Sequence, residues 1–435
     1  MSRALPNPAP PSHGTSLLSY QEARALVDAH AIQLGKKLPS TERVALGAAS
    51  GRVLAEPLHA DRDQPPFARS TRDGFACRAA EASKHKFLKL AGQSRAGDAP
   101  AGPLPEGHAW EIMTGAPIPP GADAVVMIEH VETSARKVRL LPPRTVKPGE
   151  NIVEQAAQAR QRDLLLPVGS SIHAAQIALA AACGYAALDV FQRPRVAILT
   201  TGDELVPVDA LPVPGQIRNS NAPMLAALVA DAGGEPWVLP RTADTAEALD
   251  AVLAKAAAAD LLLISGGVSA GKFDLVEPAL ARAGARFHFT GVRIQPGKPL
   301  VFAELPGNNP LTAQVKDGTK CCFGLPGNPV SSAVTFLLFA APILGALSGR
   351  RDSGPRFALA RLRADAGKRG KSDLTRFLPA FCNFSADTGQ LPEVELIPSQ
   401  GSGDLAALAR SNCYLVVPEE AARLEAGAIV RILLP

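Results

Sequence analysis

The spacing of apolar positions divides the chain into segments of different character. Between residues 191 and 349, short apolar runs such as Arg195–Thr200 and Leu261–Ile264 alternate with longer helical patterns. Such alternation is typical of buried parallel strands joined by crossover helices. We therefore predict a doubly wound parallel sheet, covered by helices on both faces, for residues 191–349.

The elements of this predicted α/β domain can be placed individually. The predicted strands are Arg195–Thr200, Trp237–Leu239, Leu261–Ile264 and Cys321–Gly324, and the predicted helices are Pro223–Asp231, Ala246–Ala258, Val276–Ala283 and Val330–Leu347. Asn221 is predicted to cap the first of these helices and Gly233 to end it. Residues 305–319 interrupt the alternation and are predicted to form a mobile hairpin or loop.

The rest of the chain is predicted to be a mixture of helical and β segments. Residues 19–48 read as a helix that Ser19 caps, and residues 149–190 return to helix. Between them, and again after Arg356, short apolar runs are separated by turn residues, which predicts β domains. The expected parts are a disordered tail at 1–15, an elongated helical linker domain at 16–58 and 149–190, an inserted small β domain at 59–148, the α/β domain at 191–349, and a C-terminal β-barrel-like domain at 350–435.

Composition narrows the class of protein. The chain carries 45 basic and 41 acidic residues, a balance too even to favour nucleic acid or a membrane surface as partner. Its first residues lack the apolar run of a signal peptide, and the apolar stretch 334–347 is too short to span a bilayer. None of the six cysteines forms a C-x-x-C pair and none of the eight histidines shows metal-ligand spacing. We expect a cytoplasmic protein whose Cys321 and Cys322 are inert core thiols.

Polar, glycine-rich loops follow three of the predicted strands. They span residues 201–204, 265–271 and 325–331. In a parallel α/β sheet, ligands bind at the carboxyl ends of the strands, and glycine lets backbone amides approach an oxyanion closely. One such loop alone is more often only a tight turn. Three at one sheet edge favour a site for phosphate or another tetrahedral oxyanion.

Charged residues near these loops complete the candidate site. Lys298 lies in a stiff Pro-Gly-Lys-Pro turn and is predicted to hold an oxyanion. Glu204 and Asp274 are predicted to bind Mg²⁺ or position substrate, because this hard ion prefers oxygen ligands. For Asp244, a metal role and a helix-capping role are equally favoured. In the β domain, Asp73 precedes a turn glycine, and an Asp-Gly pair alone is usually an ordinary turn.

Taken together and in order, these motifs resemble those of the MoeA family, which includes the C-terminal domain of gephyrin. The motifs that carry the resemblance lie at 71–76, 112–117, 201–205, 218–221, 265–269, 296–299, 324–331, 400–404 and 409–412. The resemblance implies four domains and an elongated homodimer. It also implies that the chain takes adenylylated molybdopterin and molybdate, releases AMP with the help of Mg²⁺, and leaves molybdenum on the dithiolene.

The resemblance also implies roles for particular residues. The active cleft is expected to bring the small β domain of one subunit against the α/β domain of the other. The expected catalytic residues are Asp73, Thr114, Glu204, Asp274 and Lys298. The expected cofactor-binding residues are Gly266, Gly267, Ser269, Asn328, Pro329 and Ser331. The expected metal ligands are Glu204, Asp244 and Asp274. The adenylyltransferase and apo-molybdoenzymes are the expected protein partners.

The chain departs from the family pattern at several polar positions. Residues 156–158 read Ala-Ala-Gln where the family usually has an acidic stretch, and Gly291 and Gln295 stand where members carry lysine. Arg72 adds a cation beside Asp73. These departures keep open a non-catalytic dimeric scaffold. A molybdopterin adenylyltransferase is a further alternative, which the inserted β domain and the 325–331 loop disfavour.

Overall fold

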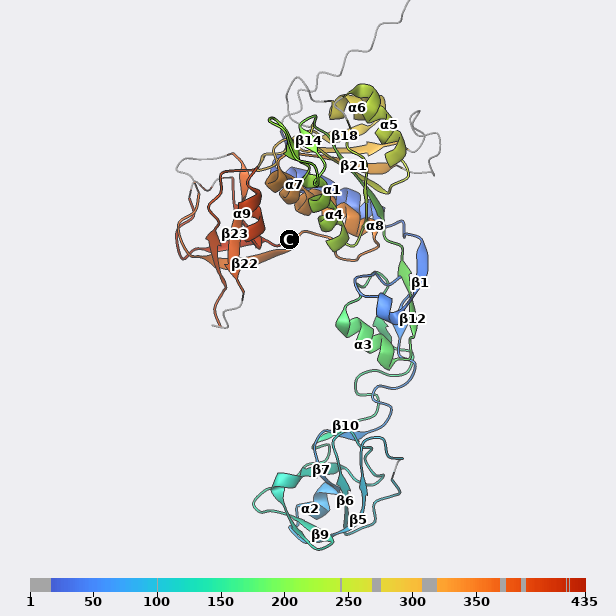
Figure 1. The fold of residues 1–435 in the computed structure, drawn as a ribbon. Coiled ribbons are helices and arrows are strands. Elements are labelled where there is room, and N and C mark those ends of the chain that lie inside the picture. Colours follow the sequence, from blue (N-terminus) through green and yellow to red (C-terminus); the bar gives the residue numbers. More distant parts are fainter. Residues whose placement is uncertain are drawn as a thin grey trace, which may run out of the picture.

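The protein is an elongated molecule of four parts, seen in the computed structural model (Figure 1). The described residues are 17–99, 101–242, 245–267, 275–306, 319–367, 373–384, 389–419, 421 and 423–435. The predictions for the tail 1–15, for most of the loop 305–319, and for Asp244, Ser269 and Asp274 therefore lie outside the described residues. In Figure 1 the α/β domain and the C-terminal domain lie together at one end, and the small β domain lies at the other.

The α/β domain contains a six-stranded sheet in the order β16-β13-β17-β21-β20-β18. Its strands are β13 (Arg195–Thr200), β16 (Glu235–Val238), β17 (Leu261–Ser265), β18 (Arg286–Phe289), β20 (Val301–Leu305) and β21 (Lys320–Leu325). The first four strands in the sheet order run parallel, which confirms the predicted parallel sheet. The sequence reading missed β18 and β20, which add an antiparallel edge.

Helices cover both faces of this sheet. They are α1 (Tyr20–Leu34), α4 (Asn221–Asp231), α5 (Ala246–Ala256), α6 (Val276–Arg282), α7 (Pro329–Thr335), the π-helical turn η3 (Phe336–Ala340) and α8 (Ala341–Leu347). One apolar core unites the sheet with α1, α4 and α7–α8, and a second unites it with α5 and α6. The continuous helix Pro329–Leu347 is apolar and long enough to cross a membrane, but 83% of that apolar window is buried inside the protein.

Two details of the helices differ from the sequence prediction. The residue before α4 is Ser220, and Asn221 lies inside the helix, where its side chain donates hydrogen bonds to two neighbouring loops instead of capping. The N-terminal helix ends at Leu34, and residues 41–45 form a strand. Ser19 does cap this helix, with Glu22 completing a capping box.

The linker contains less helix than the sequence pattern indicates. Helix α1 packs on α8, so it belongs to the α/β domain core. The linker itself has α3 (Ala174–Ala182) and three two-stranded ribbons. These ribbons pair β1 (Thr41–Ala45) with β12 (Ala187–Phe191), β2 (Leu58–His59) with β11 (Leu164–Leu166), and β3 (Arg69–Ser70) with β10 (Ile152–Val153).

The two remaining parts are built from β-strands. The small β domain has the strand order β7-β4-β6-β5-β9-β8. Its strands are β4 (Gly74–Cys77), β5 (Leu88–Ser94), β6 (His108–Ile112), β7 (Ala124–Met127), β8 (Val131–Ser134) and β9 (Lys137–Leu140), and it also contains α2 (Ala79–Ala82).

The C-terminal domain is a barrel. Its strands are β22 (Phe357–Leu362), β23 (Thr375–Asn383), β24 (Glu393–Leu396), β25 (Cys413–Val417) and β26 (Ile429–Leu433), with α9 (Leu405–Arg410) beside them. The barrel closes because β23 pairs with both β24 and β25, which leaves no free edge among these five strands. A short strand from the α/β domain, β19 (Ile294–Gln295), pairs with β23 and joins the two domains.

Candidate active site

The strands β13, β17 and β21 end side by side, so the loops that follow them begin at the same edge of the parallel sheet. In register, Thr200 of β13 lies beside Ser265 of β17, which lies beside Leu325 of β21. The loops after these three strands therefore meet at the carboxyl edge of the sheet. They line a cavity of about 960 Å³. This is the edge at which the sequence predicted an oxyanion site.

Glycine allows two of these loops to pack against each other. Gly266 has a φ of +97°, and a Cβ atom there would lie 2.6 Å from the carbonyl oxygen of Thr201. Its N–H donates to the carbonyl of Leu325 at 3.1 Å. Glycine is thus required by the contact between the loops as well as by any ligand that approaches them.

Asn221 at the start of α4 holds two of the loops together. Its Nδ2 group donates to Ser265 Oγ at 2.9 Å and to the carbonyl of Gly327 at 2.6 Å. The Gly327 carbonyl only accepts, so it fixes the orientation of the amide. Asn221 Oδ1 and Thr201 Oγ1 are buried and have no hydrogen-bond partner within the described part of the chain. Both residues line the cavity, so its wall contains two polar side chains that each have a buried oxygen without a partner among the described residues.

Several predicted site residues lie around this cavity. Those that line it are Glu204, Gly266, Gly267, Asn328 and Pro329. The first is exposed at its mouth, and Pro329 begins α7. The sequence reading gave no ligand-binding role to Thr201, Asn219 or Asn221, although two of them lie in the 218–221 motif.

Lys298 and Ser331 line a second cavity of about 800 Å³. Pro299, Pro326 and Asn328 line both cavities, so the two adjoin. The C-terminal barrel forms the other wall of the second cavity, with Arg376 on β23 and residues 396–402. Arg376 is 5% exposed, and its Nε atom has no partner among the described residues.

The turn that carries Lys298 is held from both sides. Gln295 pairs with Arg376 of the barrel strand β23. A Cβ atom at Gly297 would lie 2.6 Å from Thr335 Cγ2, so the turn packs closely on α7. Lys298 itself is exposed, and its carbonyl accepts from the N–H of Val292 at 3.0 Å. The lysine is thus a cation on a fixed backbone.

Asp73 and Thr114 lie together in the small β domain. The N–H of Thr114 donates to Asp73 Oδ1 at 2.6 Å, and this hydrogen bond lowers the pKa of the Asp73 carboxyl. Within one chain, however, the small β domain and the α/β domain lie at opposite ends of the molecule (Figure 1). One chain therefore does not bring Asp73 near Glu204 or Lys298, and their meeting across two subunits stays a prediction.

Comparisons with known proteins assign the family. Residues 18–184 match the MoeA N-terminal region (domains I and II), residues 197–346 match a probable molybdopterin binding domain, and residues 361–434 match the MoeA C-terminal region (domain IV). A protein of Nostoc sp. named molybdopterin molybdenumtransferase is 36% identical over 405 residues, which is 90% of this chain and 88% of that protein. The chain belongs to the MoeA family.

Other members of the MoeA family agree with this assignment. A molybdopterin molybdenumtransferase of Bacillus subtilis is 34% identical over 92% of this chain and 91% of that protein. The crystal structure of the molybdopterin biosynthesis MoeA protein from Pyrococcus horikoshii OT3 superposes with a TM-score of 0.75 at 28% identity, over 97% of this chain and 100% of that one. The similarity thus extends over all four parts of the fold.

The structure clarifies two departures of this MoeA-family chain. The N–H groups of Ala156 and Gln158 donate to the carbonyls of Pro65 and Gln64. These bonds use only backbone atoms, so the linker keeps them without an acidic side chain there. At Gly291, a Cβ atom would lie 2.4 Å from Leu17 Cδ2, so a lysine at this position would require Leu17 to move.

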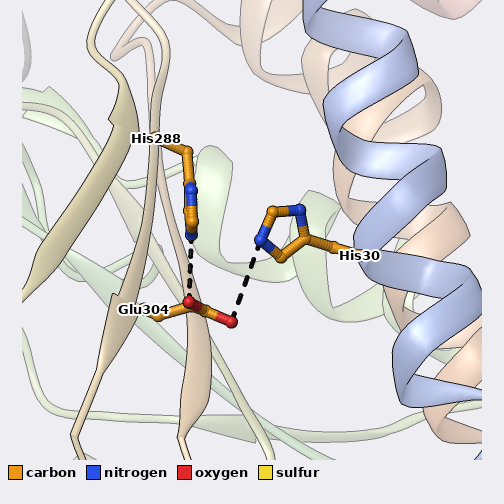
Figure 2. A group of neighbouring side chains, drawn as sticks. All are labelled: His30, His288 and Glu304. Carbon is orange, nitrogen blue, oxygen red and sulfur yellow. Dashed lines mark hydrogen bonds and ion pairs between the residues drawn. The ribbon is translucent and has the colours of Figure 1, made fainter.

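Two neighbouring cysteines, Cys321 and Cys322, are buried in β21. Burial raises the pKa of the Cys321 thiol to about 12, and Cys322 is fully buried in the same strand, as expected for inert thiols. The sequence expectation about histidine is incomplete, because folding brings His30, His288 and Glu304 together (Figure 2). They come from α1, β18 and β20, and no local spacing reveals such a group.

Proposed function

We propose that this chain is a molybdopterin molybdenumtransferase that acts at the two adjoining cavities of its α/β domain. The proposal rests on one observation: three loops from parallel strands and the Lys298 turn line two adjoining cavities whose walls include polar and charged side chains. A cavity of about 960 Å³ lies near the upper end of the usual range for small-molecule sites, which suits a substrate as large as a nucleotide-linked pterin.

Each cavity suits one substrate. Adenylylated molybdopterin would bind in the larger cavity, where the Thr201 hydroxyl and the loop amides can donate to its phosphates. Molybdate would bind in the smaller cavity. Lys298 and Arg376 both line that space, and two cations suit a dianion that is surrounded by protein.

A divalent cation also fits the larger cavity. Its wall offers the exposed Glu204 carboxylate, a hard oxygen donor. We propose that Glu204 holds Mg²⁺ there together with Asp244 and Asp274. When bound, Mg²⁺ would neutralise part of the phosphate charge. Lys298 and Arg376 would orient molybdate against the pterin, and the loops would limit access of water.

The small β domain would complete the site from a second subunit. Asp73 is ionised at neutral pH, because its pKa lies below the ordinary aspartate value. It is exposed in the small β domain, which lies at the opposite end of the molecule from the α/β domain, as expected for a group that acts on a neighbour's substrate. We propose a homodimer in which Asp73 and Thr114 of the partner subunit face Lys298 and Glu204.

The central test measures AMP release from adenylylated molybdopterin with and without molybdate. We expect molybdate-dependent release by the unchanged protein, and loss of that release in Lys298→Ala with the dimer intact. Lys255→Ala is the matched control, because Lys255 is an exposed lysine of α5 on the other face of the sheet. Equal release by both variants would remove Lys298 from the site.

Mixed dimers test the composite site. Asp73→Asn and Lys298→Ala chains, each inactive alone, are unfolded, mixed and refolded together. Random pairing leaves about a quarter of all sites with both groups intact, so about a quarter of the activity should return. No recovery in verified mixed dimers means that one chain supplies both groups. Synthesis of adenylylated molybdopterin from molybdopterin and ATP would instead favour an adenylyltransferase.

A further inference from the structure

A second group of side chains, remote from the proposed active site, has the composition of a metal site. His30 of α1, His288 of β18 and Glu304 of β20 converge between the helix and the antiparallel edge of the sheet (Figure 2). Their nearest ligand atoms all lie within 4.8 Å of one another. His288 Nε2 lies 3.1 Å from Glu304 Oε2, and His30 Nε2 lies 3.9 Å from Glu304 Oε1.

Each side chain is held in place by the fold. Phe287 pairs with Ala303 and Phe289 with Phe302, so His288 is the extra residue of a β-bulge. Bulges redirect a side chain, and here His288 faces α1. Glu304 lies two residues after Phe302 and therefore on the same face of β20. The Phe302 ring lies 5.0 Å from that of His30 and 4.9 Å from that of His288.

The hydrogen bond of His30 prepares its other ring nitrogen for a metal. Its Nδ1 lies 2.7 Å from the carbonyl of Leu26, which can only accept, so Nδ1 carries the proton. Nε2 then presents a lone pair towards Glu304. A backbone carbonyl behind the ring is the usual outer support of a metal-binding histidine.

The local charges also favour a cation. The side chains of His288, Glu304 and His30 are 8%, 18% and 22% exposed. The Glu304 carboxylate is thus mostly buried beside two imidazole rings, and a bound cation would compensate its charge.

We propose that His30, His288 and Glu304 form a binding site for a divalent transition metal of the Zn²⁺ type. Two imidazoles and one carboxylate are a known zinc donor set with the fourth position open. Ligands on a tetrahedral zinc lie about 3.4 Å apart, so the observed separations need only small side-chain shifts. The proton on His288 Nε2 would move to Nδ1, which keeps that ring neutral. The metal would fasten α1 to the sheet edge.

Zinc titration of the full-length protein tests the site. Protein stripped with a chelator is titrated with Zn²⁺ in excess Mg²⁺, which keeps the cavity carboxylates occupied. We expect one tight site per chain by calorimetry, and His30→Gln and Glu304→Gln should each weaken it by more than the roughly 10–100-fold typical of outer-support changes. His108→Gln is the matched control, because His108 Nδ1 also lies 2.7 Å from a backbone carbonyl. It should bind zinc like the unchanged protein.

A second measurement does not depend on the variants folding. X-ray absorption of the unchanged, zinc-loaded protein should show scattering from two imidazole rings and no sulfur neighbour. Absence of tight binding, equal affinity in His30→Gln and His108→Gln, or a spectrum without imidazole scattering would each overturn the proposal. None of these outcomes bears on AMP release, so the proposed function stands or fails separately.

Discussion

Replacing Asn221 by leucine should loosen the active-site loops and destabilise the α/β domain. Leucine has the same branching and the same number of side-chain heavy atoms as asparagine and is a good helix former, so α4 should persist. What it removes are the two hydrogen bonds to Ser265 Oγ and to the Gly327 carbonyl. These bonds strengthen the contact between the loops, which the Gly266 N–H bond to the Leu325 carbonyl also supports.

The expected loss of stability depends on whether Ser265 and the Gly327 carbonyl find other hydrogen-bond partners after the substitution. Gly327 is exposed, so water can reach its carbonyl, whereas Ser265 is buried with other oxygens only at 3.5 Å. Two hydrogen bonds at about 0.5–1.5 kcal/mol each predict a loss of about 1–3 kcal/mol in the unfolding free energy of this domain. We also expect a higher KM for adenylylated molybdopterin, since Asn221 is a positioning residue.

Tryptophan fluorescence can follow the unfolding of the α/β domain separately from that of the small β domain. The chain has two tryptophans, Trp110 in the small β domain and Trp237 in β16. In a Trp110→Phe background, urea unfolding followed by fluorescence therefore reports the α/β domain. Asn151→Leu is the control, because it removes a hydrogen bond to the Val125 carbonyl in the small β domain. A change below about 0.5 kcal/mol for Asn221→Leu, or an equal change for Asn151→Leu, would refute the reasoning.

Two further predictions concern the small β domain. Gly74→Ala places a Cβ atom 1.9 Å from the carbonyl oxygen of Val126, so the domain should lose more than about 2 kcal/mol, measured by Trp110 fluorescence in a Trp237→Phe background. The Asp73 carboxyl should titrate below the ordinary aspartate pKa by carbon NMR, because it accepts the Thr114 N–H bond. With a depressed folded-state pKa, its contribution to stability is complete above the unfolded pKa and disappears as the pH falls through the folded one. An ordinary midpoint would mean that the bond is absent in solution.

Three of the parallel strands, β13, β17 and β21, were predictable from the sequence because each is a continuous, mostly buried apolar run. Strand β13 has the predicted bounds, β17 is longer by one residue at one end, and β21 is longer by one residue at each end. The fourth, β16, is mostly exposed and begins two residues before its predicted start. Strand β18 was missed because it is short and only partly buried, and β20, which is as long as β17, follows the stiff turn 296–299 directly. Antiparallel pairing at that edge depends on the return path of the turn, which apolar spacing does not encode.

For the site, too, features that depend on neighbouring residues were predictable, whereas contacts between distant elements were not. The loop motifs were recognisable, since glycine and polar residues after a strand have a local meaning. Asn221 was misread because an asparagine that caps a helix and one that bridges two loops have the same local sequence context. His30, His288 and Glu304 come from three distant elements, and only the β-bulge turns His288 towards the helix.

The two chain segments that connect the inserted domain to the rest of the protein lie side by side, which has an evolutionary consequence. In the ribbon of β2 and β11, His59 lies opposite Leu164, so the chain leaves and returns at neighbouring points. Domains with adjacent ends can be inserted into, or removed from, a host chain with little disturbance. The small β domain, which bears Asp73, can therefore be gained or lost as one unit. A domain of this kind can diverge, or be exchanged between lineages, while the sheet and barrel that line the two cavities are preserved.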